Sequence, residues 1–344
     1  MINKNRDQNN KVRLTSKGAS RGIPIDKPSE YGPKVIETKL DKLLQNIPMQ
    51  LKDVLFLGGN ITSKLPVSDE VFIKWGRKLS SLYQTSIRWT SLSRWLGYYS
   101  QRKRRDVRGF YHLKNWKNLE DDLSGFDTLS SKNQNLLKEY LYGLCLNNNK
   151  LESFCQRELQ TAVLNNDLVS FKDKFWIGGE NPWNSFFEIS RPRNDVKWSS
   201  QYPDTMEVVF KKPKNDKIAK WLKENVEDEF RLEKLGFQLK MKFIEGNYGT
   251  SHLEFKPNVT PHVTGGDKIV MDAKTDIEEY GVRWTIRHEY GHILRIPDCY
   301  HEFYDSEKEL MINYQLDVTD LMCSRAGKMN ERIYKELKRA YLKK

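Results

Sequence analysis

The chain has 344 residues, of which 38% are hydrophobic and 30% charged, and a formal net charge of +12. Its length exceeds the usual size of one domain, so we expect two domains. No apolar run is long enough to cross a bilayer and no signal peptide is evident, which argues against a transmembrane segment. The positive charge favours an anionic surface or polymer as a partner.

Residues 1–33 are predicted to form a basic, disordered tail. Up to Gly22 the only acidic residue is Asp7, against six basic residues: Lys4, Arg6, Lys11, Arg13, Lys17 and Arg21. We expect this tail to contact the anionic partner. A second basic run, Arg102–Arg105, is interpreted as the solvated end of a helix, with a phosphate-binding patch or a protease processing site as alternatives.

Residues 34–190 are predicted to form a mostly helical domain. Apolar residues recur at helical spacing in four stretches, namely Val35–Ile47, Ser68–Leu96, Asn133–Leu146 and Leu151–Leu164. Cys145 and Cys155 flank the turn between the last two, where either core packing or a disulfide would fit. Glycines and prolines from Trp176 onwards predict an irregular connector, and we place the domain boundary at residues 191–202.

Residues 203–344 are predicted to form an α+β domain. Alternating apolar residues indicate four strands, at Met206–Phe210, Phe237–Phe243, Leu253–Phe255 and Ile269–Ala273. An amphipathic helix is expected over Ile218–Phe230, between the first two strands. A last helix begins after Asn330, which is a favourable N-cap.

A pattern with chemical meaning, HExxH, lies within this second domain. Residues four apart share one face of a helix, so His288 and His292 can bind a single zinc ion. Asp298 follows after a proline that must end the helix, and its carboxylate can be the third ligand. Glu289 is adjacent to the ligands, where a general base would be needed.

The start of this helix is also marked in the sequence. Thr275 is followed three residues later by Glu278, which is the spacing of a capping box. We therefore expect the helix to begin next to Thr275.

These residues resemble the metzincin zinc peptidases, in particular the snapalysin-like members with the pattern HExxHxxGxxD. The resemblance implies that His288, His292 and Asp298 bind zinc, that Glu289 is the general base and that Met322 forms the Met-turn. It implies a catalytic domain with a twisted mixed sheet, an active-site helix, the Met-turn and a C-terminal helix. Because bacterial peptidases of this type are usually exported, it also implies a secreted or periplasmic protein, with a cytoplasmic location as the alternative.

Two positions depart from the family pattern. Arg295 stands where the family has glycine, and since arginine resists positive φ, we expect the turn before Asp298 to be shaped differently. No tyrosine stands two residues after Met322, so the tyrosine ligand of some metzincins has no counterpart there. If Asp298 is not the third ligand, the alternatives are His301, Glu302, Asp305, Glu307 and Glu309.

The metzincin arrangement would bring Cys299 close to Cys323, because they follow the third ligand and Met322 respectively. A disulfide between them would join the ligand turn to the Met-turn. The alternative is that both are buried thiols. The remaining histidines, His112, His252 and His262, lie outside any ligand spacing and are interpreted as ordinary histidines.

The predicted function is that of a zinc metalloendopeptidase, a hydrolase that cleaves an extended protein or peptide substrate. Tyr300, His301 and Tyr304 are the candidates for a second donor to the oxyanion. Substrate is expected to add as a strand to the edge of Ile269–Ala273. The alternative function is a basic protein that binds an anionic polymer, with a structural HExxH helix. Cleavage specificity, activation, oligomeric state and the role of the helical domain are left open.

Overall fold

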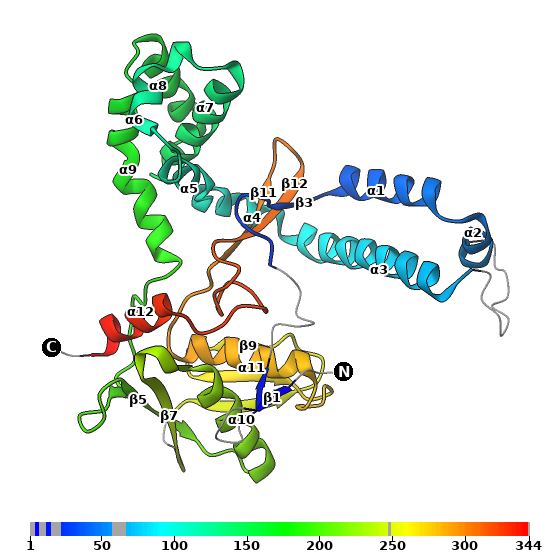
Figure 1. Ribbon diagram of the computed structural model, residues 1–344, viewed down its shortest axis with the longest axis vertical. Helices are drawn as coiled ribbons and strands as arrows, with labels where there is room; N and C mark the ends of the chain where they lie inside the picture. The colour runs from blue at the N-terminus through cyan, green and yellow to red at the C-terminus, as the bar shows by residue number, and fades with distance from the viewer. Residues whose placement is uncertain (1–3, 7–11, 15–21, 57–66, 247–248, 343–344) are drawn as a thin grey trace. The chain divides into compact units, whose positions relative to one another are not determined.

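The computed structural model describes residues 4–6, 12–14, 22–56, 67–246 and 249–342, and it has the mixed α+β composition that the sequence predicts (Figure 1). The chain divides into two compact units. Unit 2 comprises Pro28–Asp106 and Glu302–Asn313. Unit 1 comprises the segment before Pro28, the long segment Val107–His301 and the segment from Tyr314 onwards. The helices after Val107 therefore group with the strands of the carboxyl-terminal part, which differs from the predicted division at residues 191–202.

Unit 2 contains a helical hairpin and a small sheet. Helices α1 (Pro33–Asn46) and α3 (Asp69–Leu92) lie side by side in Figure 1, with α2 (Met49–Phe56) at their far end. Their shared core consists of Leu43, Ile47, Leu51 and Trp75. A hairpin of β11 (Tyr300–Asp305) and β12 (Leu310–Gln315), which the sequence analysis missed, pairs with β3 (Ser29–Tyr31).

The basic run lies at the end of α4 (Leu96–Arg102). Arg102 donates to the carbonyl of Glu302, and Lys103 lies 3.4 Å from the carboxylate of Asp305. Only 17% of the Lys103 side chain is exposed. The prediction of a solvated helix end is therefore wrong for these two residues, because the unpredicted hairpin packs against them.

The first part of unit 1 is a cluster of five helices. They are α5 (Arg108–Lys114), α6 (Leu119–Ser124), α7 (Ser131–Leu146), α8 (Glu152–Leu164) and α9 (Leu168–Ser185). A disulfide joins Cys145 to Cys155 inside their core. The irregular connector predicted from Trp176 is wrong up to Ser185, because α9 buries Phe171 and Phe175 in this core and tertiary packing outweighs the glycines and Pro182.

The second part of unit 1 contains the predicted strands. A four-stranded sheet has the order β4-β5-β7-β6, and a three-stranded sheet has the order β8-β10-β9. The strands are β4 (Val196–Trp198), β5 (Thr205–Lys211), β6 (Arg231–Leu232), β7 (Phe237–Ile244), β8 (His252–Lys256), β9 (His262–Thr264) and β10 (Lys268–Asp272). Helix α10 (Asp216–Glu229) connects the parallel pair β5 and β7, as expected for a crossover.

The predicted substrate edge is not available. Strand β10, which corresponds to the predicted Ile269–Ala273, is paired on both sides, parallel to β8 and antiparallel to β9. The prediction failed because the short strand β9 carries little apolar alternation. Strand β9 is instead the outer strand of this sheet.

The amino-terminal segment is only partly described. Lys4–Arg6 (β1) and Val12–Leu14 (β2) form an antiparallel pair, and Ser29–Tyr31 is strand β3, which differs from the disordered tail predicted from composition. The other residues of the predicted tail up to Arg21 lie outside the described residues. Across the described ranges, no helix is long and apolar enough to span a membrane.

Candidate metal site

The candidate site is built on helix α11 (Tyr280–Ile293). Its buried face includes Trp284, Tyr290 and Ile293, which fix it against the sheets. The helix begins after Glu279, so the N-cap predicted at Thr275 is wrong. The Thr275 hydroxyl instead donates to Asp272, the last residue of β10, because short polar side chains compete for local hydrogen bonds.

His288, His292 and Asp298 come together on one side of this helix. Both Nε2 atoms lie 3.2 Å from the same oxygen of Asp298, Oδ1. The imidazole rings are perpendicular, with centroids 4.9 Å apart. The Asp298 Oδ1 atom is buried but receives no hydrogen bond of good geometry. The three atoms therefore converge on a common point instead of bonding one another.

Backbone carbonyls orient both imidazoles. The Nδ1 of His288 lies 3.1 Å from the carbonyl of Leu321, and the Nδ1 of His292 lies 2.9 Å from the carbonyl of Ile296. A carbonyl can only accept, so each Nδ1 must carry the proton. Each Nε2 then presents a lone pair toward Asp298, which is the arrangement that metal-binding histidines require.

The turn that brings Asp298 back to the helix passes through Arg295, whose φ is +63°. The expectation of a differently shaped turn is therefore wrong, since Arg295 adopts the left-handed conformation that a glycine would supply. The turn is closed by hydrogen bonds from Arg295 N to the His292 carbonyl and from Ile296 N to the Gly291 carbonyl. These bonds hold arginine in a conformation that costs about 1–2 kcal/mol.

Met322 is fully buried and packs against α11 at Gly291, between the two histidines in sequence. A side chain at Gly291 would overlap the Met322 sulfur, so a larger residue there would require Met322 to move. The Leu321 carbonyl next to Met322 is the acceptor that orients His288. The loop from Asp317 to Met329, named the Met322 loop below, thus supports the site from beneath α11.

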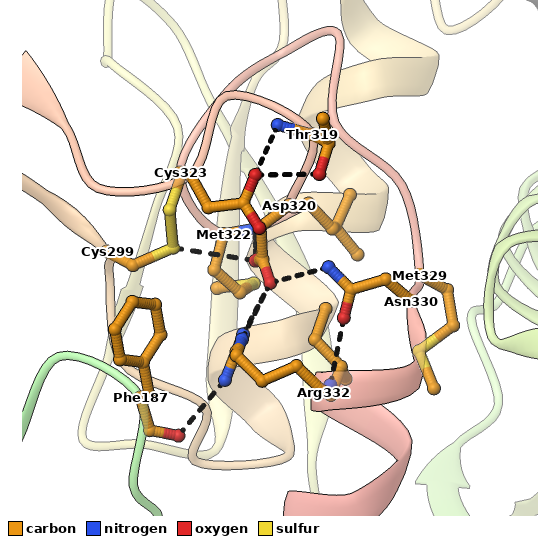
Figure 2. A network of polar contacts seen from close by, with 12 residues as sticks. Phe187, Cys299, Thr319, Asp320, Met322, Cys323, Met329, Asn330 and Arg332 are labelled. Carbon is orange, nitrogen blue, oxygen red and sulfur yellow. Dashed lines mark hydrogen bonds and ion pairs between the residues drawn. A yellow bond between two sulfur atoms is a disulfide. The ribbon is translucent and has the colours of Figure 1, made fainter. Parts of the chain in front are cut away.

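Asp320 organises the Met322 loop (Figure 2). It is fully buried and accepts from Met322 N at 2.9 Å, from Asn330 Nδ2 at 2.8 Å and from Arg332 Nε at 3.0 Å. The Arg332 guanidinium also lies 4.6 Å from the ring centre of Phe187. Both carboxylate oxygens of Asp320 accept hydrogen bonds, as a buried carboxylate requires.

Cys299 and Cys323 form a disulfide beside Asp320. It joins the residue after Asp298 to the residue after Met322, which is the link that the metzincin resemblance implied. Backbone bonds support it, since Cys299 N donates to the Met322 carbonyl at 3.3 Å. The ligand turn and the Met322 loop are thereby one connected structure.

A buried ion-pair network holds α11 from the other side. Arg287, next to His288, is 2% exposed and pairs with Glu229 at 2.8 Å and with Asp228 at 3.1 Å. Glu229 also accepts from Met329 N, at the end of the Met322 loop. Both carboxylates come from α10 or its end, so the network connects α10, α11 and the loop.

The converging atoms open onto a cavity of about 530 Å³ in unit 1. Its lining residues come from β9 with its turns, from α11 and from the chain after it, and are Pro261, His262, Val263, Gly266, His288, Glu289, His292, Arg295, Ile296, Asp298 and Tyr300. His262, interpreted as an ordinary histidine from the sequence, is therefore part of the pocket. No spacing rule could have found it, because it reaches the pocket only through strand pairing.

Glu289 is 7% exposed and makes no hydrogen bond to the described residues. Burial raises its pKa and the neighbouring Asp298 raises it further, while the imidazoles of His288 and His292 act in the opposite direction. A carboxylate in these surroundings holds a proton more readily than an exposed one. Its carboxylate faces the pocket beside the converging ligand atoms.

The other predicted site residues separate into two groups. Tyr300 lines the pocket, whereas His301 is fully buried, with its ring against Phe186 and Tyr314. Tyr304 belongs to unit 2, where it packs on Trp89. The alternative ligands also belong to unit 2 and form ion pairs there with Arg88, Lys103 and Lys34, namely Glu302, Asp305, Glu307 and Glu309.

One further cluster in the described part of the chain has residue types that can bind a metal. Among the described residues, the groups with metal-ligand types and spacing are His288–His292–Asp298 and Cys299–Asp320–Cys323. The second is occupied by its own disulfide and hydrogen bonds.

Comparison of the chain with protein-family models, with curated proteins and with solved structures found no match.

Proposed function

We propose that the protein is a zinc metalloendopeptidase. The observation that carries the proposal is the convergence of His288 Nε2, His292 Nε2 and Asp298 Oδ1, each within 4.8 Å of the others, at the wall of a pocket. Two imidazoles and one carboxylate are a ligand set that suits catalytic zinc, with a position left open on the pocket side. The buried methionine under α11 agrees with the resemblance to metzincins and supports the same proposal.

Bound zinc would lower the pKa of a water and polarise a substrate carbonyl. Glu289 accepts the proton of the attacking water and later donates it to the leaving amine, which its burial favours. Tyr300 and His262 line the same pocket and are the candidates for stabilising the oxyanion. The ligands and the base thus come from α11 and its following turn, and the oxyanion donors from β9 and β11.

An extended polypeptide is the expected substrate. Strand β9 is the outer strand of its sheet and contributes His262 and Val263 to the pocket. A peptide can add to this edge through main-chain hydrogen bonds, which places a backbone carbonyl beside the ligands whatever the side chains are. This supports endopeptidase activity and transfers the predicted substrate edge from β10 to β9.

The decisive experiment measures zinc per chain and hydrolysis of a denatured protein in parallel. Wild type is expected to bind one equivalent of zinc and to cleave, and Asp298→Ala to lose most of both. Asp276→Ala is the matched control, since Asp276 is an exposed carboxylate just before α11. Full zinc in Asp298→Ala would contradict the assigned ligand set, and zinc-loaded wild type without cleavage would contradict the peptidase.

An exported location is proposed as well. The structure contains two disulfides, Cys145–Cys155 and Cys299–Cys323, which account for all four cysteines of the chain. Disulfides persist in oxidising compartments and are rare in the cytosol. Thiol titration of the denatured, unreduced protein should find no free thiol, and four free thiols in protein from its native source would argue for the cytoplasm.

An anionic polymer is the second candidate ligand, favoured by a separate groove in unit 2. A cavity of about 740 Å³ between α1 and α3 is lined by Lys39, Lys42, Arg77, Lys78 and uncharged residues, without an acidic one. Cations gathered without counter-charges attract polyanions. Binding of an oligonucleotide or heparin that weakens steeply with salt, and that is lost in Lys42→Glu with Lys78→Glu, would support it.

A further inference from the structure

Arg295 is an arginine without a partner at the metal-site pocket. It lines the pocket and is exposed, and its guanidinium forms no hydrogen bond or ion pair with any described residue. This contrasts with Arg193, Arg287 and Arg332 of the same unit, which are all paired with carboxylates. An unpaired guanidinium in a concave site is a donor of five N–H groups with no acceptor.

The guanidinium also has a defined position. It lies over Gly266, in the turn between β9 and β10, where any side chain on residue 266 would overlap it. A second arginine holds that turn, because Arg193 donates to the Gly266 carbonyl at 2.8 Å. Arg295 is therefore supported at the end of the β9 edge, on the rim where substrate would enter.

The backbone conformation of Arg295 indicates a functional role for its side chain. Its φ of +63° is the conformation that glycine adopts without strain, so arginine at this position destabilises the fold. Strain that the surrounding structure maintains is characteristic of functional positions. Packing does not account for it, because the side chain is exposed.

We propose that Arg295 is a specificity-determining residue that binds a carboxylate of the substrate, an inference that rests on the proposed peptidase function. A guanidinium binds carboxylates through two parallel hydrogen bonds and is the side chain best suited to that geometry. The carboxylate has two sources, an Asp or Glu side chain or the carboxyl terminus of a peptide. Both would lie beside β9 with the scissile bond near His288 and His292.

The test separates binding from hydrolysis by using the zinc-loaded Glu289→Gln variant. Its affinity is measured by fluorescence anisotropy for amidated peptides in which one glutamate is moved along a glutamine background. One position should bind about 10- to 100-fold more tightly than the all-glutamine peptide, and Arg295→Gln should abolish that gain. Arg191→Gln is the matched control, since Arg191 is exposed and does not line the pocket.

Three outcomes decide the inference. The terminal carboxylate is the source if affinity increases only when the peptide is not amidated, and only when Arg295 is present. Arg295→Glu should reverse the preference in favour of lysine at the same position. An equal gain in Arg295→Gln overturns the proposal, and so does the absence of any gain both from a glutamate at every position and from a free carboxyl terminus. Failure of the peptidase function is distinguishable, because it appears as zinc-loaded wild type that binds the peptides but cleaves none.

Discussion

The pocket and the Met322 loop both contact the histidine-bearing turns of α11, and they differ in how their polar groups are satisfied. In the loop, Asp320 accepts hydrogen bonds from the backbone, an amide and a guanidinium. In the pocket, Glu289 and Arg295 have no partner among the described residues, and Asp298 Oδ1 receives no well-formed hydrogen bond.

This difference separates the groups that stabilise the fold from those that are available for chemistry. A buried polar group without a partner costs free energy, so a fold retains it only where it serves another purpose. The saturated loop supplies the rigidity that a site needs, since His288 is oriented by the Leu321 carbonyl. We therefore expect pocket substitutions to change activity and loop substitutions to change stability.

The largest effect is expected from Glu289→Gln. Removing the general base should lower kcat by about 10²- to 10⁴-fold, while zinc content and melting temperature stay close to wild type. The measurements are steady-state hydrolysis, elemental analysis and thermal unfolding. Retained turnover, or a large loss of stability, would break the assignment of the pocket carboxylate to chemistry.

A smaller effect, on stability, is expected from Asp320→Ala. It leaves Arg332, Asn330 and Met322 N without their acceptor, and breaking a buried charge pair costs about 3–5 kcal/mol. Denaturant unfolding measures the loss. Asp317→Ala is the control in the same loop, since Asp317 only accepts from Thr319 and should cost about 1 kcal/mol. Equal losses in the two variants would contradict the central role of Asp320.

The sequence predicts the elements of the site better than their surroundings. Strands β5, β7, β8 and β10 and helices α10 and α12 (Glu331–Tyr341) follow from apolar periodicity, and Asn330 caps α12 as expected. HExxH spacing brings His288 and His292 together because helix geometry is local. The approach of Asp298 depends on one turn, and the structure shows that Arg295 adopts the required positive φ.

What the sequence does not predict depends on long-range pairing. Strand β9 is three residues long and gains its place only by pairing with β10, so neither the true edge nor His262 could be found from periodicity. Helix α9 was missed because its glycines and Pro182 disfavour helix locally, whereas Phe171 and Phe175 pack into a distant core. The β11–β12 hairpin does not follow from periodicity, because three successive residues of β11, His301, Glu302 and Phe303, are all buried and two of them are polar.

A third test is the pH dependence of stability in the metal-free protein. After allowance for solvent exposure, His292 and Asp298 are expected to contribute on the order of 1 kcal/mol to the free energy of unfolding. The pKa of His292 is raised, because the effect of burial, which lowers it, is outweighed by Asp298. The pKa of Asp298 is lowered, because the effect of burial, which raises it, is outweighed by the imidazoles of His288 and His292. His292 then stabilises the fold below its unfolded pKa of about 6.5, and Asp298 does so above about 3.9.

The stability difference between metal-free wild type and Asp298→Asn should therefore be largest between about pH 4 and 6.5, and should shrink on either side. Urea unfolding with a chelator present, across this range, measures it. Zinc-loaded protein should behave oppositely in this window and become less stable toward acid, because protons compete for the imidazoles. A difference that does not vary with pH would contradict the coupling of these residues.

The smallest effect is expected from relieving the backbone strain at Arg295, which lines the pocket. Arg295→Gly should stabilise the metal-free protein by about 0.5 kcal/mol, since relief of about 1–2 kcal/mol at positive φ is partly offset by the greater entropy of glycine in the unfolded chain. Asn258→Gly, at a φ of +60° outside the pocket, is the control and should change less, because asparagine tolerates this conformation. If Arg295→Gly instead destabilises the fold, the contact between the exposed guanidinium and Gly266 contributes to stability. Arg295 would then be a stabilising residue, like the hydrogen-bonded groups of the Met322 loop.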